Sequence, residues 1–259
     1  MTTNAVSTLK RINVEGIGTV ELNLEERGEG QPYLVLHGGA GPQSVATFAQ
    51  LLADQGHNRV LAPTHPGFGG TNRPDQLNSV RKLAVLYRDL LDDLHLERVA
   101  VIGNSVGGWI AAEIALLGSP RVTRIVLLDA VGIELEGHPV TDVSGLSVPE
   151  IQALSFHDPT RFRVDPATVP DAQKAIMAAN ATTLAVYAGS PAMADPTLLG
   201  RLRGITIPTL VLWGDSDQIV DASYGQAYAA AIDGASFEML SATGHMPQLE
   251  SPGLVLQKI

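Results

Sequence analysis

The sequence predicts an α/β protein built on a mainly parallel, doubly wound sheet. Short apolar runs rich in β-branched residues alternate along the chain with segments whose apolar residues recur at helical spacing. The runs 33–36 and 99–102 are apolar throughout, as expected for strands that helices cover on both faces, and each leads into a glycine-rich turn. Because parallel strands end at one edge of a sheet, we expect ligands to bind at that edge.

The composition narrows the class of protein further. A length of 259 residues with 45% hydrophobic residues suits one large domain. The 17 basic against 27 acidic residues give a formal charge of -10, which argues against nucleic acid or an anionic membrane as a partner. The chain has no cysteine, no signal-peptide pattern and no apolar run near the ~20 residues of a spanning helix, so we expect a cytoplasmic protein.

The first half of the chain reads as an edge hairpin followed by alternating strands and helices. Alternation of apolar and polar residues around Gly16 and Gly18 predicts the hairpin, and leucines at helical spacing predict the long helix before the central strand. The expected elements are a hairpin over 11–26, strands over 33–36 and 59–62, and helices over 45–53 and 80–94.

The second half continues the alternation but is interrupted once. We expect strands over 99–102, 124–129, 208–213 and 236–240, and helices from Gly107 to about Leu117 and over 222–232. Residues 131–204 have turn signals and helical pieces but no strand pattern, which predicts a helical lid inserted after the sixth strand; a packed extra layer is the alternative. The core would then comprise 1–130 and 205–259, and its short last helix is compatible with a truncated C-terminus.

One turn carries the pattern of a nucleophile elbow. Residues 103–108 read Gly-Asn-Ser-Val-Gly-Gly, and glycines around a serine allow a strained strand-to-helix corner that exposes its hydroxyl. The backbone N–H of Val106, at the start of the helix, would point toward the same region as the Ser105 hydroxyl. It would stabilise an oxyanion formed there. An ordinary β-to-α turn is the alternative, because Gly and Ser are common in turns.

The glycine-rich turn after residues 33–36 is the second candidate feature. It reads His37-Gly38-Gly39-Ala40-Gly41-Pro42, and its glycines allow the backbone to approach a ligand closely. The amide of Gly39 is therefore the candidate second oxyanion donor, with a flexible loop as the alternative. A phosphate-binding loop is not expected, because no lysine follows at the required position.

An acid and a base follow the serine in the chain. A serine hydroxyl needs a base to accept its proton, and the base needs a third group to orient it. Ser105, Asp217 and His245 occur in the order Ser, acid, His. Asp215 and Asp129 also lie at predicted strand ends, so the identity of the acid stays open between Asp217 and Asp129.

These motifs together resemble those of the α/β-hydrolases from about Val14 to Leu256. The resemblance is carried by His37-Gly38-Gly39, by residues 103–108, by Trp213-Gly214-Asp215-Ser216-Asp217 and by Gly244-His245. It implies the α/β-hydrolase fold and a serine hydrolase that works through an acyl-enzyme. It also implies site residues: catalytic Ser105, Asp217 and His245, oxyanion donors Gly39 and Val106, and supporting His37, Gly38, Gly103, Asn104 and Gly107.

The resemblance favours cleavage of a small carboxylic ester but leaves alternatives open. A serine at the elbow argues against haloalkane dehalogenase or epoxide hydrolase activity, because similar enzymes of those classes use aspartate. Carbon-carbon hydrolases of vinylogous diketones resemble the elbow, although they tend to have an aromatic residue where this chain has Met246. Lactonase, proline iminopeptidase and haloperoxidase relatives also remain, as does a ligand receptor that retains the triad. Asp221 replaces a proline that is frequent in similar proteins.

The remaining histidines do not suggest a metal site. His57, His95, His138 and His157 lack partners at metal-ligand spacing, and His65 lies between prolines in a turn of structural character. We therefore expect no metal and no cofactor, and a small acyl compound as the substrate. The sequence leaves the substrate and the oligomeric state open, a homo-oligomer included.

Overall fold

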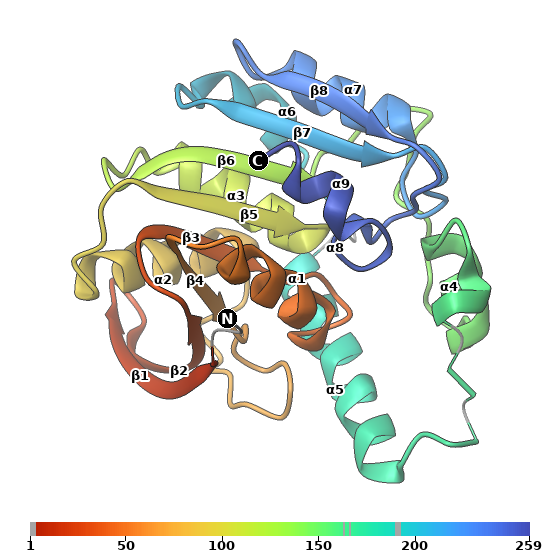
Figure 1. The fold of residues 1–259 in the computed structure, drawn as a ribbon, viewed down its shortest axis with the longest axis horizontal. Coiled ribbons are helices and arrows are strands. Elements are labelled where there is room, and N and C mark those ends of the chain that lie inside the picture. Colours follow the sequence, from red (N-terminus) through yellow and green to blue (C-terminus); the bar gives the residue numbers. More distant parts are fainter. Residues whose placement is uncertain (1–3, 163, 166, 190–192) are drawn as a thin grey trace.

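The protein is built around an eight-stranded sheet, seen in a computed structural model that describes residues 4–162, 164–165, 167–189 and 193–259. The strand order is β1-β2-β4-β3-β5-β6-β7-β8 (Figure 1). Strands β3 to β8 are parallel, and β1 and β2 are antiparallel at one edge, which confirms the predicted class. The strands are β1 (Val6–Val14), β2 (Gly18–Arg27), β3 (Gln31–Leu36), β4 (Asn58–Pro63), β5 (Val99–Asn104), β6 (Val122–Leu128), β7 (Thr209–Gly214) and β8 (Ser236–Leu240).

Helices follow most strands, as the alternating pattern predicts. Those of the core are α1 (Gln43–Asp54), α2 (Val80–Asp93), α3 (Val106–Leu116), α7 (Ala222–Ala230), α8 (Pro247–Glu250) and α9 (Pro252–Leu256). Those between β6 and β7 are α4 (Val148–Ser155), η1 (Pro159–Phe162), α5 (Asp171–Ala188), α6 (Leu198–Arg201) and η2 (Leu202–Gly204). In the described residues, no helix is both long and apolar enough to cross a membrane.

The edge hairpin is longer than the sequence pattern indicates. We predicted it over 11–26, whereas β1 begins at Val6, which pairs with Glu26 of β2. Val6 and Leu9 are more than half exposed, so the first half of β1 does not bury a regular apolar face. Backbone pairing with β2 extends the strand there without the hydrophobic alternation that the prediction relied on.

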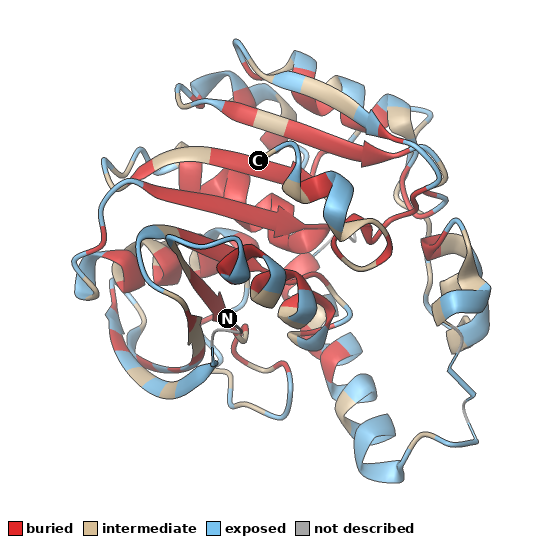
Figure 2. Ribbon diagram, in the orientation of Figure 1, coloured by how far each residue is buried: buried red, intermediate tan, exposed pale blue. Residues whose placement is uncertain are grey.

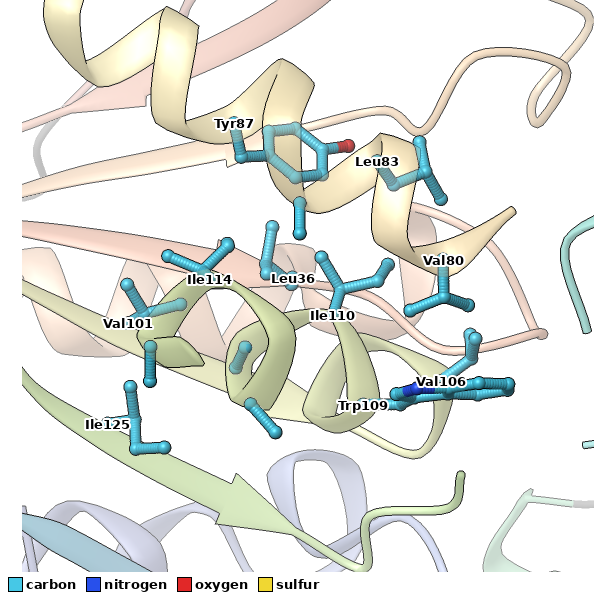
Figure 3. Close-up of a cluster of buried hydrophobic side chains, with 14 of the residues drawn as sticks. Leu36, Val80, Leu83, Tyr87, Val101, Val106, Trp109, Ile110, Ile114 and Ile125 are labelled. Carbon is cyan, nitrogen blue, oxygen red and sulfur yellow. The ribbon is translucent and has the colours of Figure 1, made fainter. Parts of the chain in front are cut away.

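The sheet is covered on both faces because alternate residues of its central strands enter different apolar cores. Val99 and Val101 of β5 belong to the core under α2 and α3, whereas Ala100 and Ile102 belong to the core under α1. Every residue of β5 is buried (Figure 2). Figure 3 shows the first core, with side chains of α2 and α3 meeting those of β3, β5 and β6. These two cores fix the strand ends that carry the candidate site.

Helix α2 illustrates how the sequence sets this packing. The Ser79 hydroxyl caps its first turn by accepting a hydrogen bond from the backbone of Lys82 at 3.4 Å. Leu83, Leu86 and Tyr87 recur at helical spacing, and all are buried against α3 or the sheet. The predicted amphipathic helix is therefore present where its leucines place it.

The segment between β6 and β7 projects from the carboxyl edge of the sheet (Figure 1). The first half of α5 is almost entirely exposed, and its buried residues lie in the second half: Asn180, Thr183, Tyr187 and Ala188. The segment is helical, as predicted, and only the last turns of α5 pack on the core. Its role as a lid stays a prediction.

A buried ionic cluster anchors the C-terminal end of this segment to the core. Arg201 of α6 donates from Nη1 to Oε2 of Glu113 at 2.8 Å, and Glu113 lies on α3 with a side chain only 5% exposed. Arg201 also contacts Asp195 at 3.0 Å, and Arg81 of α2 lies 3.7 Å from Glu113. The cluster therefore joins three segments of the chain around one buried carboxylate.

Replacing Arg201 by alanine should destabilise the fold by about 3 kcal/mol, because breaking a buried ion pair leaves the Glu113 charge poorly compensated. Chemical unfolding at pH 7 measures the change. Arg203→Ala is the matched control, because that exposed arginine lies two residues further along. Equal unfolding free energies for the two variants would show that Glu113 does not depend on Arg201.

Candidate active site

The predicted site residues converge on the carboxyl edge of five adjacent strands. His37 follows β3, Ser105 follows β5 and Asp129 follows β6, while Asp217 and His245 lie in the loops after β7 and β8. All five side chains are buried or nearly so. The sheet order therefore brings together residues that are far apart in sequence, at the edge where parallel sheets bind ligands.

Ser105 has the geometry of a strained strand-to-helix corner. Its backbone has φ 56° and ψ -120°, a region that residues with a side chain rarely adopt. A Cβ at Gly103 would lie 2.1 Å from the carbonyl oxygen of Gly107, and one at Gly107 would lie 2.3 Å from that of Leu36. Glycine is thus required on both sides of Ser105 for the corner to form.

Two backbone amides beside Ser105 are available to a ligand. Within the described residues, neither the N–H of Val106 nor that of Gly39 donates a hydrogen bond to the protein. Val106 is the first residue of α3, where the helix supplies no acceptor. The Gly38 backbone lies close to the elbow: a Cβ at Gly38 would lie 3.1 Å from the Cβ of Ser105. The turn that contains Gly39 therefore lies beside Ser105.

His245 is oriented by Asp217. The Nδ1 of His245 lies 2.7 Å from Oδ2 of Asp217, and the Asp217 carboxylate has no exposed surface. Its other oxygen accepts hydrogen bonds from the backbone of Ile219 at 2.7 Å and of Val220 at 3.1 Å. These hydrogen bonds fix the orientation of the Asp217 carboxylate, which accepts the Nδ1 proton of the imidazole and leaves Nε2 free to act as a base.

The side chain of Asn104 connects the elbow to the histidine loop. It donates from Nδ2 to the carbonyl of His245 at 2.8 Å. Within the described part of the chain, no hydrogen bond joins the Ser105 hydroxyl to His245. Catalytic hydrogen bonds are often long before a substrate binds, so the absence of this bond does not exclude proton transfer from Ser105 to His245.

The other two aspartates that compete for the role of acid contact different groups. Asp215 accepts hydrogen bonds from Ser216 Oγ and from the backbone of Ala242 and Thr243, and none from His245. Asp129 accepts one from the backbone of Gly214. Asp221, at the position where similar proteins often have proline, caps α7 and pairs with His138.

His37 and His65 form a buried, neutral pair behind the Gly39 turn. His37 donates from Nδ1 to the carbonyl of Gly38 at 2.8 Å and accepts at Nε2 from the backbone of His65 at 3.0 Å. His65 donates from Nε2 to the carbonyl of His37 at 2.9 Å and accepts at Nδ1 from the Tyr87 hydroxyl. Each ring nitrogen has one role, so neither ring needs a second proton, and these hydrogen bonds join the 37–38 backbone to that of His65. The supporting role of His37 stays a prediction.

Acidification should destabilise the protein through these rings. Burial lowers the pKa of His37 from 6.5 to about 4. Its contribution is complete above pH 6.5 and is lost as the pH falls toward 4, because the unfolded state binds the proton first; the loss amounts to about 3 kcal/mol. Unfolding at pH 7, 5.5 and 4 measures it. His37→Gln should flatten the pH dependence and His57→Gln, on an exposed turn, should not.

The sequence did not reveal which residues of the inserted segment contact the site. Leu184 of α5 lies against Gly39, so that a Cβ there would be 2.7 Å from its Cδ2. Asn180 accepts from the backbone of Gly69 at 2.9 Å, and Thr183 and Tyr187 donate to the carbonyls of Gly67 and Pro66. Leu184 is one of several apolar residues on this helix. The spacing of these residues in the sequence does not show which face of the helix packs on the two glycine-rich turns.

A second missed group clamps the histidine loop. The buried carboxylate of Glu250 accepts hydrogen bonds from the backbone of Gly244 at 2.7 Å, His157 at 3.0 Å and Asp158 at 2.9 Å. The backbone N–H of His245 also donates to the carbonyl of Ser155 at 2.8 Å. The end of α4 and the residues just after it therefore help to hold the histidine loop in place.

Of the described acidic and histidine side chains, those of Asp129, Asp217 and His245 have their polar atoms within 4.8 Å of one another. This is a spacing that a metal ion also uses. The Nδ1 of His245 shares its proton with Asp217, however, so that atom is not free to bind an ion.

A comparison of the sequence with models of protein families shows the family to which the chain belongs. The model of a family described as the alpha/beta hydrolase family matches residues 33–258, which is most of the chain and includes all the site residues above. The chain belongs to the alpha/beta hydrolase family. It is accordingly a hydrolase, with the fold that the four sequence motifs implied.

The chain is similar in sequence to hydrolases named for 2-hydroxy-6-oxo acids and similar in fold to an esterase. The chain is 28% identical, over 90% of its length and 89% of the relative, to a 2-hydroxy-6-oxo-2,4-heptadienoate hydrolase of Pseudomonas putida. It is 30% identical, over 94% and 91%, to a 2-hydroxy-6-oxononadienedioate/2-hydroxy-6-oxononatrienedioate hydrolase of Paraburkholderia xenovorans. Among solved structures, an esterase of Thermogutta terrifontis matches with TM-score 0.77 and 24% identity, over 97% of this chain and 96% of that one.

Proposed function

We propose that the chain is a serine hydrolase in which Ser105 is the nucleophile, His245 the base and Asp217 the residue that orients the base. The observation that carries the proposal is the 2.7 Å contact between His245 and Asp217 at the sheet edge where Ser105 forms a strained corner. A base held in one tautomer near a serine hydroxyl is the arrangement that makes serine nucleophilic.

The reaction would proceed in two balanced halves. Ser105 Oγ bonds to the acyl carbon while its proton passes to His245, and the oxyanion is stabilised by the free amides of Gly39 and Val106. The tetrahedral intermediate then expels the leaving group, which takes the proton from His245. In the second half, water gives a proton to His245 and attacks the acyl carbon, and the acid leaves as Ser105 regains a proton.

Among bonds that this machinery can break, we favour a carboxylic ester with an uncharged acyl group. The α5 side chains that contact the turns at 38–41 and 66–69 include Leu184, Asn180, Thr183 and Tyr187, and these four are uncharged. Met246, and no aromatic residue, follows His245. An alkoxide leaving group also needs only the one proton that His245 supplies.

Carbon-carbon cleavage is the second candidate, and the curated relatives favour it. The substrates in their names are 2-hydroxy-6-oxo acids with conjugated double bonds, such as the heptadienoate of the Pseudomonas putida enzyme. Such substrates carry a carboxylate, and a carbanion leaves during their cleavage. A cation or several backbone donors facing that carboxylate would be needed in addition to the triad.

Two assays on the purified protein distinguish these candidates. We expect turnover of short p-nitrophenyl esters and labelling of Ser105 by a fluorophosphonate, with slower turnover of a vinylogous 1,5-diketone. Faster cleavage of the diketone would establish the second candidate. Binding of either compound without turnover or labelling would contradict the hydrolase proposal and indicate a ligand receptor.

The inserted segment is proposed as the lid that selects the substrate. Leu184 against Gly39 is the contact that supports this role, because a side chain beside the oxyanion donors limits the acyl group that fits there. Leu184→Ala should shift the substrate preference toward longer acyl chains. Turnover of the same set of p-nitrophenyl esters by wild type and by this variant measures the shift.

A further inference from the structure

Asp129 is a buried carboxyl group with an unexplained oxygen. Its side chain has no exposed surface, and it lies at the end of β6 with φ 45°, in the left-handed region. Oδ1 accepts a hydrogen bond from the backbone of Gly214 at 2.9 Å. Oδ2 is buried and has no hydrogen-bond donor among the described residues. A buried hydrogen-bond acceptor without a partner costs free energy of folding, so the protonation state of this carboxyl group needs an explanation.

The groups around Asp129 disfavour its ionised form. The titratable groups that face it are Asp217, on the loop after β7, and His245, on the loop after β8, with polar atoms within 4.8 Å. Within the described residues, no lysine or arginine is paired with Asp129. An ionised Asp129 would place a second negative charge beside Asp217 with no cation to offset it.

The Asp217 carboxylate can accept a hydrogen bond from a protonated Asp129. Oδ1 of Asp217 already accepts from two backbone amides, and Oδ2 accepts from His245. A carboxylate oxygen has two lone pairs, so Oδ2 can accept one further hydrogen bond. A carboxylic acid at Asp129 would donate that bond from the oxygen that otherwise has no partner.

We propose that Asp129 is a positioning residue that stays protonated in the folded protein and donates a hydrogen bond to the carboxylate of Asp217. Asp217 thereby receives a second fixed hydrogen bond on Oδ2, the oxygen that accepts from His245, and its orientation toward Nδ1 is held. The buried cluster carries a single negative charge, which is neutralised when His245 accepts the serine proton. This role rests on the proposed triad. Burial and the Asp217 charge both raise the pKa of Asp129 well above its usual value, which agrees with a retained proton.

The first test measures stability and needs no catalytic activity. In Asp129→Asn the amide can still donate to Asp217 and accept from Gly214, but it cannot titrate. The contribution of Asp129 to wild-type stability should decrease as the pH rises above about 4, because only the unfolded state releases the Asp129 proton there; the contribution of the buried histidines is common to both proteins and cancels in the comparison. The Tm of Asp129→Asn minus that of wild type should therefore grow from pH 4 to pH 8. Parallel Tm curves would show that Asp129 is ionised in the fold and would overturn the proposal.

The second test measures the effect on Ser105. Asp129→Gly removes the carboxyl group and suits the left-handed backbone, and we expect it to slow fluorophosphonate labelling about tenfold, the effect of losing one hydrogen bond to a charged group. Asp129→Asn should restore labelling to within about threefold of wild type. Equal losses in both variants, with unchanged melting curves, would overturn the donor role. If wild type is not labelled at all, the proposed function fails, whereas the Tm comparison still decides the state of Asp129.

Discussion

Ser105→Ala is expected to lower kcat by about 10⁶, because every later step depends on the bond between its hydroxyl and the acyl group. The substitution removes one oxygen from a side chain that is 6% exposed, and alanine at φ 56° bears the same backbone strain as serine. The free amides of Gly39 and Val106 remain, so binding should be retained. Turnover of the preferred substrate, ester or diketone, measures the loss, and titration calorimetry measures the binding.

The control for this variant is Ser119→Ala. Ser119 precedes β6 at the opposite edge of the sheet, where its hydroxyl accepts a hydrogen bond from the backbone of Arg121 at 3.4 Å. Its activity should equal that of wild type. Full activity in Ser105→Ala, with the control unchanged, would remove Ser105 from the mechanism and with it the proposed acyl-enzyme.

The sheet and the strand-end residues were predictable because local signals specify them. Apolar runs such as 33–36 and 99–102 mark buried strands, and the glycines around Ser105 mark a corner that only they permit. Once the strands are parallel, their carboxyl ends must meet. The proximity of His245 and Asp217 therefore followed from the order of the elements and required no knowledge of side-chain packing.

The contacts of the inserted segment were not predictable in the same way. Glu250 binds the backbone of His157 and Asp158, and Leu184 lies against Gly39, across separations of about ninety to one hundred and forty residues. Such contacts depend on how helices dock, and neither helical periodicity nor turn residues encode the docking direction. The missing partner of Asp129 was also invisible, because a sequence shows that a carboxyl group is present but not what surrounds it.

Asp217→Asn is the second substitution with a very large expected effect, a fall in kcat of about 10⁴. The asparagine amide can donate to Nδ1 of His245, which would place the imidazole proton on Nε2 and prevent that atom from accepting the proton of Ser105. The hydrogen bonds that Oδ1 accepts from Ile219 and Val220 can be kept by the amide oxygen, so the loop should retain its structure. Steady-state kinetics together with a melting curve separates lost chemistry from lost folding.

The same substitution at the two neighbouring aspartates decides the identity of the acid. Asp215 accepts from loop amides on the far side of the histidine loop, so Asp215→Asn should change kcat by less than about tenfold. Among the described residues, Asp129 accepts a hydrogen bond from Gly214 alone, and its other oxygen has no donor, so Asp129 cannot replace Asp217 while it carries a proton. If Asp129→Asn gave the fall of about 10⁴ and Asp217→Asn did not, Asp129 would be the acid of the triad. The 2.7 Å contact between Asp217 and His245 leads us to expect the reverse order.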